Sequence, residues 1–122
     1  MNNSAANQNV EQIRKEVTNL FGEQKIDEVI EKLNILIRLE DPWGMHYLAS
    51  CYSNGLGVEV NLEISNQLYI KAADKGFVDS QAVLGHKYLF GFQIDKDINT
   101  GMKLLKLAAS ANNAYSNLLL AE

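Results

Sequence analysis

The sequence has little of what marks a disulfide-bonded, secreted or membrane-spanning protein. Cys51 is the only cysteine, so the chain cannot form an intramolecular disulfide and nothing indicates an oxidising compartment. The longest purely aliphatic run covers residues 118–121 and is far too short to cross a bilayer. Residues 1–9 have neither the basic end nor the apolar run of a signal peptide. We therefore expect a soluble, cytoplasmic protein.

An excess of basic residues is also absent. The 122 residues include 15 acidic and 11 basic side chains, which gives a net charge of −4. Residues 1–60 carry nine acidic and five basic side chains, whereas residues 61–122 carry six of each. Nucleic acids and anionic membranes attract basic surfaces, so the sequence disfavours both as partners. The acidic first half fits a basic protein partner, but it also fits a surface that only keeps the protein soluble.

Proline is almost absent, with Pro42 the single example. Because proline disrupts helix interiors, nearly the whole chain is free to be helical. Apolar residues recur at steps of three and four, the spacing of one helix face, and no useful alternating strand pattern is present. Glycine, asparagine and aspartate punctuate these segments as caps and stops. We predict an all-α protein of about seven helices, at residues 9–22, 27–39, 42–53, 61–75, 80–90, 97–112 and 114–122, after a flexible N-terminus at 1–8.

The most specific feature is an internal repeat of about 36 residues. A shift of 36 aligns these pairs: Leu48 with Leu84, Tyr52 with Tyr88, Gly55 with Gly91, Val58 with Ile94, Asn61 with Asp97, and Ala72-Ala73 with Ala108-Ala109. The leucine and tyrosine lie four apart on one helix face and are candidate core residues. The glycine ends the first helix of each unit, the asparagine or aspartate caps the second, and the paired alanines allow two backbones to approach closely.

This pattern resembles the Sel1-like repeat, a relative of the tetratricopeptide repeat. One copy reads Ser80-Gln-Ala-Val-Leu-Gly-His-Lys-Tyr-Leu-Phe-Gly, and another begins Leu48-Ala-Ser-Cys-Tyr-Ser-Asn-Gly-Leu-Gly-Val. The resemblance implies a right-handed α-α superhelix, or solenoid, of antiparallel helix hairpins with a concave face. It divides the domain 9–122 into a degenerate first hairpin (9–41), two repeats (43–78 and 79–114) and a truncated terminal helix (115–122).

The sequence departs from the family pattern at four positions. Gln93 replaces the second glycine of the turn, Ser65 and Gly101 replace a usual alanine, and Asn112 replaces the final glycine. These departures concern the shape of the loops and the closeness of helix packing, and the family resemblance does not depend on them.

A search for chemistry in the sequence finds no constellation. His46 and His86 occupy different repeat positions and have no ligand-type residue four away, and a single cysteine gives no zinc pattern. The glycines at 55–57 follow a helix, and no Lys-Ser or Lys-Thr pair follows them, so they do not form a phosphate loop. Cys51 is expected to be a half-buried small hydrophobic residue. We predict no catalytic residues, no cofactor, no metal and no enzymatic activity.

The resemblance implies a module that binds another protein through the concave face. The variable positions of the two inward helices are the candidate partner-binding residues: Tyr47, Ser50, Asn54, Val83, His86, Lys87 and Phe90, with Cys51 among the same variable positions. An alternative surface is the apolar edge formed by Leu118, Leu119 and Leu120.

Two further interpretations of function stay open. The first is a dedicated inhibitor, such as a bacterial immunity protein that neutralises a basic toxin domain, because charge complementarity speeds capture. The second is an enzyme or a binder of a small ligand in the concave groove. The sequence names neither the partner nor the oligomeric state.

Overall fold

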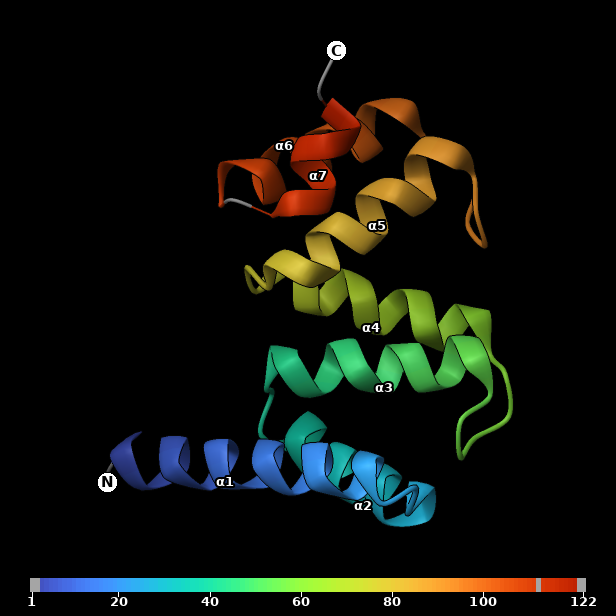
Figure 1. Cartoon of the computed structure of the whole chain (residues 1–122). Helices are drawn as coiled ribbons and strands as arrows, with labels where there is room; N and C mark the ends of the chain where they lie inside the picture. Colours follow the sequence, from blue (N-terminus) through green and yellow to red (C-terminus); the bar gives the residue numbers. More distant parts are fainter. Residues whose placement is uncertain (1–2, 112, 121–122) are drawn as a thin grey trace.

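A computed structural model describes residues 3–111 and 113–120, and within these ranges the chain forms seven helices and no strand. The predicted all-α superhelix is therefore confirmed. Each helix packs mainly against its neighbours in the chain, and α1 and α7 lie at opposite ends of the stack (Figure 1). The helices are α1 (Asn3–Gly22), α2 (Ile26–Arg38), α3 (Pro42–Asn54), α4 (Leu62–Asp74), α5 (Val78–Phe90), α6 (Ile98–Ser110) and α7 (Ala114–Leu120).

The repeat of 36 residues is visible in the helix bounds themselves. Helices α2, α4 and α6 begin at residues 26, 62 and 98, and they end at 38, 74 and 110. Helices α3, α5 and α7 begin at 42, 78 and 114. Because α2 keeps this register although its hairpin lacks the sequence motif, the second helix of the first hairpin occupies the place of a repeat helix.

Two predicted helix starts differ from the structure. Helix α1 begins at Asn3, earlier than the predicted start at residue 9. Helix α5 begins at Val78, two residues before the predicted start at Ser80, with the backbone of Phe77 at the N-cap position. The hydroxyl group of Ser80, inside the first turn of α5, contacts Nδ1 of His46 at 2.8 Å. The predicted residues 121 and 122 of the last helix lie outside the described residues.

The caps predicted from sequence are present. Asp41, Asn61 and Asp97 each accept a hydrogen bond from the backbone N–H three residues further on, at 3.0–3.1 Å. Gly55 and Gly91 follow the ends of α3 and α5 with φ values of 70° and 68°, the left-handed conformation that glycine adopts at least cost. The two long loops that follow, after α3 and after α5, project from the same side of the stack (Figure 1).

The departures from the family pattern have identifiable consequences. Gln93 has φ of 63° and thereby keeps the left-handed conformation of Gly57, one repeat earlier at 74°, so the loop shape survives the loss of the glycine. A Cβ atom at Gly101 would lie 2.7 Å from the backbone nitrogen of Leu89 and 2.8 Å from the carbonyl oxygen of Gly85. Helices α5 and α6 therefore approach too closely for the usual alanine. Asn112 lies outside the described residues.

The core forms two clusters along the stack. The first joins the first hairpin to α3, and its buried members are Val17, Val29, Leu33, Leu36, Leu48 and Cys51. The second joins the two repeats, and its buried members are Ala49, Tyr69, Ala73 and Leu84. The predicted core leucines are thus buried, while Tyr52 and Tyr88 pack against the clusters and remain partly exposed. Cys51 is fully buried rather than half-buried as predicted, because the first hairpin covers it.

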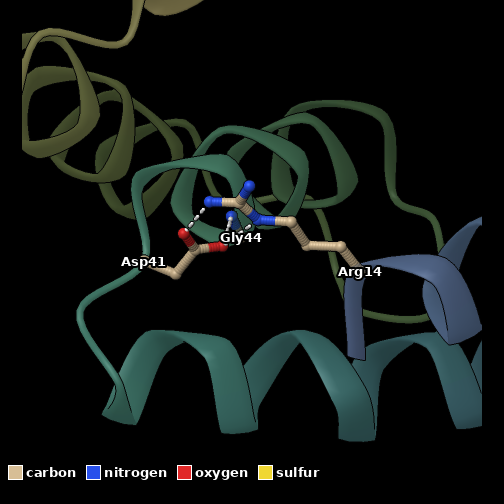
Figure 2. Close-up of polar contacts among 3 residues, drawn as sticks. All are labelled: Arg14, Asp41 and Gly44. Atoms are coloured by element: carbon tan, nitrogen blue, oxygen red, sulfur yellow. Dashed lines mark hydrogen bonds and ion pairs between the residues drawn. The ribbon is translucent and has the colours of Figure 1, made fainter. Parts of the chain in front are cut away.

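An ion pair fixes the first hairpin to the repeats (Figure 2). Asp41 is 5% exposed, and its carboxylate caps α3 through the backbone N–H of Gly44. The same carboxylate accepts two hydrogen bonds from the guanidinium group of Arg14 on α1, one of them from Nε at 3.0 Å. These hydrogen bonds raise the pKa of Arg14, and the guanidinium carbon also lies 5.9 Å from the centre of the Trp43 ring. One side chain therefore both starts α3 and holds α1 against it.

Candidate protein-binding groove

A groove of about 540 Å³ runs between the two repeats. Helix α3 contributes His46, Ser53 and Asn54, and helix α5 contributes Asp79, Ala82, Val83, His86 and Lys87. Tyr69 of α4, Phe92 and Gln93 of the loop after α5, and Asn113 complete the lining. The groove thus lies along the two helices that the sequence predicted to face a partner.

Four of the predicted partner-binding residues line this groove, namely Asn54, Val83, His86 and Lys87. The other three lie beside it. The ring centres of Tyr47 and Trp43 lie 4.5 Å apart with the planes tilted by 50°. Ser50 accepts hydrogen bonds from the Asn54 amide through its carbonyl oxygen and its hydroxyl group. Phe90 is 56% exposed.

Sequence reasoning missed the remaining lining residues, some of which lie on α3 and α5 themselves and some elsewhere. It considered only the variable positions of one helix in each repeat, whereas Tyr69 comes from the second helix of its hairpin and Phe92 and Gln93 come from a loop. His46 was examined only as a metal ligand. The substitution of glycine by Gln93 was the one signal in the sequence that could have pointed to this loop.

His46 links α3 to α5 at one end of the groove. Its Nδ1 atom contacts the Ser80 hydroxyl group at 2.8 Å, and its ring lies 5.3 Å from the Tyr69 ring and 5.2 Å from the Phe77 ring. Burial lowers the pKa of His46, and the nearby carboxylate of Asp79 opposes this shift in part. Ser80 has no exposed surface, so the pair ties two helices together and presents no accessible nucleophile.

Lys87 lies at the floor of the groove and is only 4% exposed. Its ammonium group donates a hydrogen bond of 2.5 Å to Oε1 of Gln93. The nitrogen also lies 5.5 Å from the centre of the Tyr69 ring and 5.3 Å from that of Phe92, which are cation–π distances. Within residues 3–111 and 113–120, no carboxylate forms an ion pair with it. Burial lowers the pKa of Lys87, since the charged form is the one that loses hydration.

Aromatic side chains are exposed at the mouth of the groove. Phe90 and Phe92 are 56% and 53% exposed, and their rings lie 4.9 Å and 6.4 Å from the ring of His86. Large aromatic side chains are enriched among the residues that dominate binding energy at interfaces. This group of three rings, His86, Phe90 and Phe92, is called the aromatic rim below.

The carboxylate side chains of residues 1–60 are not among the groove residues given above. Asp79 is the only carboxylate side chain among the groove residues given above. Glu16 on α1 pairs with Lys32 on α2 at 3.0 Å, and Glu23, just after α1, pairs with Lys25 at 3.2 Å. The described part of the chain contains no group of three His, Cys, Asp or Glu residues that could hold a metal ion. None of the helices described is both long and apolar enough to span a membrane.

The repeat motif and the stacked hairpins agree with a family model. The model described as the Sel1 repeat matches residues 44–77 and 78–113. The chain belongs to the Sel1-repeat family. Each match contains one helix pair, α3 with α4 and α5 with α6, and the groove lies across the boundary between the two. Sel1 repeats are in general modules for protein–protein interaction.

Solved structures of Sel1-repeat proteins are similar to this chain. A Sel1 repeat protein from Oxalobacter formigenes is 31% identical with a TM-score of 0.79, over 86% of this chain and 43% of that one. A protective antigen of uropathogenic Escherichia coli strains is 25% identical with a TM-score of 0.71, over 91% of this chain and 27% of that one. The chain therefore spans less than half of either protein.

The Helicobacter pylori cysteine-rich protein B has the same fold, with a TM-score of 0.73 and 17% identity over 92% of this chain and 95% of that one. Comparison with curated proteins finds no match.

Proposed function

We propose that this Sel1-repeat chain is a non-enzymatic protein-binding module that holds a segment of its partner in the groove between α3 and α5. The observation that carries this proposal is the groove itself, which both repeats build and which the aromatic rim borders. A groove lined by rings, amides and few charges suits a peptide, because rings pack on side chains while amides bond to the main chain.

The dimensions of the groove fit a short extended segment. On α5 the lining runs from Asp79 to Lys87, which at about 1.5 Å per residue is roughly 12 Å. An extended peptide rises about 3.3 Å per residue, so roughly four residues would lie along it. Asn54, Ser53 and Asn113 supply the hydrogen-bonding groups that such a main chain requires.

The proposal is tested with the tagged protein as bait in a lysate of its own organism, followed by titration of the recovered partner. His86→Ala and Phe90→Ala should each weaken binding by about fivefold or more, since aromatic side chains that dominate interfaces contribute more than about 1 kcal/mol. Leu107→Ala on α6 is the matched control, because Leu107 is 54% exposed and Phe90 56%. The proposal fails if Leu107→Ala abolishes binding while the two groove variants bind as the wild type does.

A second candidate is the dedicated inhibitor of a basic protein such as a toxin domain. The observation in its favour is the acidic surface of α2, where Asp27, Glu28 and Glu31 are exposed. These carboxylates lie outside the groove, so a basic partner would have to extend beyond it. Reversal of Glu28 and Glu31 to lysine should then slow association, and more strongly at low salt, because ions screen such steering. An acidic partner, or association unchanged by the reversal, would remove this candidate.

A further inference from the structure

The two repeats can be compared position by position, and two residues of the second repeat stand out. Lys87 occupies the position of the fully buried Cys51, and Gln93 occupies that of Gly57. The backbone is the same at both places. The N–H of Leu56 bonds to the carbonyl oxygen of Cys51 at 3.0 Å, and the N–H of Phe92 bonds to that of Lys87 at 2.9 Å. The first repeat therefore reaches this geometry with neither a lysine nor a glutamine.

Each of the two residues is unfavourable for folding when considered alone. A buried ammonium group loses its hydration, and a non-glycine residue with φ of 63° is strained. Yet the two side chains meet, because Oε1 of Gln93 accepts a hydrogen bond from Nζ of Lys87. The strained backbone of Gln93 is what places its amide at this point of the groove. Together the two residues hold a positive charge at the floor of the groove.

The described residues satisfy this charge only in part. An ammonium group has three N–H donors, and among the described residues only Gln93 accepts a hydrogen bond from it. The rings of Tyr69 and Phe92 cover other sides but offer no lone pair. A carboxylate would supply both further acceptors and a negative charge. Asp79, roughly 12 Å away along α5 by its rise per residue, would repel a carboxylate at the other end of the groove.

We propose that the groove binds a partner segment that carries an aspartate or glutamate side chain, which pairs with Lys87 while Gln93 holds the ammonium group in position. The carboxylate belongs to a side chain rather than to a chain terminus, because Lys87 is 4% exposed and a protruding side chain can reach it while the main chain stays among the amides above. This inference rests on the proposed function and specifies the chemistry of the partner.

The test uses a phage-displayed library of random ten-residue peptides, fused at their C-termini so that no free carboxylate is presented. Selected peptides are synthesised with free and with amidated C-termini and titrated by fluorescence anisotropy. We expect an aspartate or glutamate at a common position, with equal affinity for both end groups. Replacement of this acidic residue of the peptide by asparagine or glutamine should weaken binding about tenfold or more. Lys87→Met in the protein should have an effect of the same size, as expected for a charged pair of low exposure. The two changes together should reduce the binding affinity no more than either one alone.

Two further variants separate binding from folding. Lys87→Met keeps the length of the side chain and removes the buried charge, so its melting temperature should equal or exceed that of the wild type. Gln93→Gly introduces the residue that the first repeat has at this position. It should lower the affinity for the peptide with the acidic side chain. The affinity for the peptide in which that side chain is replaced by its amide, which is already weaker, should stay unchanged. Loss of the folded state in Lys87→Met would overturn the inference, since the lysine would then serve the fold.

Other outcomes also overturn it. These are selected peptides without an acidic residue, binding that depends on a free C-terminus, no selected peptide at all, or Lys87→Met binding as the wild type does. Different results would refute the proposed function itself. If peptides without acidic residues bind and His86→Ala releases them, the groove still binds protein segments and only the carboxylate is wrong. If neither His86→Ala nor Phe90→Ala changes the affinity for the selected peptides, the groove is not the binding site.

Discussion

Replacement of Asp41 by alanine should destabilise the protein far more than the same change at Asp97. Both aspartates are N-caps that accept a hydrogen bond from the backbone N–H three residues on, at 3.1 Å in each case. They differ in their surroundings. Asp41 is 5% exposed and also binds the guanidinium group of Arg14, whereas Asp97 is exposed and its further side-chain partner is the hydroxyl group of Thr100. The pair of variants therefore isolates the ion pair from the cap.

The expected magnitude follows from the contacts that are lost. Loss of an N-cap costs about 1 kcal/mol of unfolding free energy. Hydrogen bonds to a charged group contribute roughly 1.5–3 kcal/mol, and the lower end applies here because the Arg14 side chain is 35% exposed and water screens it. Asp41→Ala should therefore cost about 2–3 kcal/mol. Asp97→Ala should cost clearly less, because no ion pair is broken.

The assay is urea denaturation followed by circular dichroism at 222 nm, at neutral pH and low salt. A double-mutant cycle of Asp41→Ala with Arg14→Met measures the coupling directly, and we expect about 1 kcal/mol or more. Equal costs for Asp41→Ala and Asp97→Ala, or a coupling below about 0.5 kcal/mol, would refute the reasoning. In that case the first hairpin would be held to α3 by its apolar cluster alone.

Two further predictions concern the interior. Gly101→Ala should cost about 1–3 kcal/mol in the same assay, because its Cβ atom would collide with the backbone of Leu89, while Gly22→Ala, with no atom within 4 Å of the new Cβ, should be close to neutral. A neutral Gly101→Ala would mean that α5 and α6 can separate freely. The stability of the wild type should fall as the pH falls from about 6.5 towards 5, because the pKa of His46 is lower in the folded than in the unfolded chain, so the unfolded state binds the proton first. His46→Phe should show a smaller loss over this range, and an unchanged loss would contradict the assignment.

Much of the fold could be predicted because its signals are local. The helices follow from apolar spacing, and their ends follow from Asn61, Asp97, Gly55 and Gly91, which act on backbone groups within a few residues. The contact between Arg14 and Asp41 spans 27 residues and joins different helices. No periodicity encodes such a pair, so the sequence identified Asp41 as a cap and left Arg14 without a role.

The groove was harder to predict because the family resemblance directs attention to one helix of each pair. It points to α3 and α5, which do line the groove, whereas Tyr69 reaches the groove from α4. Lys87 was selected as a variable inward residue, and its burial was not foreseen. The internal repeat did contain part of that information, since a shift of 36 places Lys87 on Cys51, a residue expected to be half-buried.

Backbone strain alone does not identify a functional residue in this chain. Gln24, Glu40 and Gln93 all have positive φ, with values of 63°, 56° and 63°. Gln24 and Glu40 are exposed turn residues next to helix ends, and Glu40 stands one repeat before Gly76, where φ is 90°. Their conformation is explained by the turns that they close.

Gln93 differs because the strain is accompanied by specific contacts on both sides of the residue. Its carbonyl oxygen accepts a hydrogen bond of 2.8 Å from the Asn66 amide, and its side chain accepts one of 2.5 Å from Lys87. A glycine at this position could keep the first contact and the turn, but it could not provide the second. The side chain of Gln93 is therefore accounted for by the buried ammonium group, and the carboxylate that we propose for the partner segment is what gives the ammonium group a function.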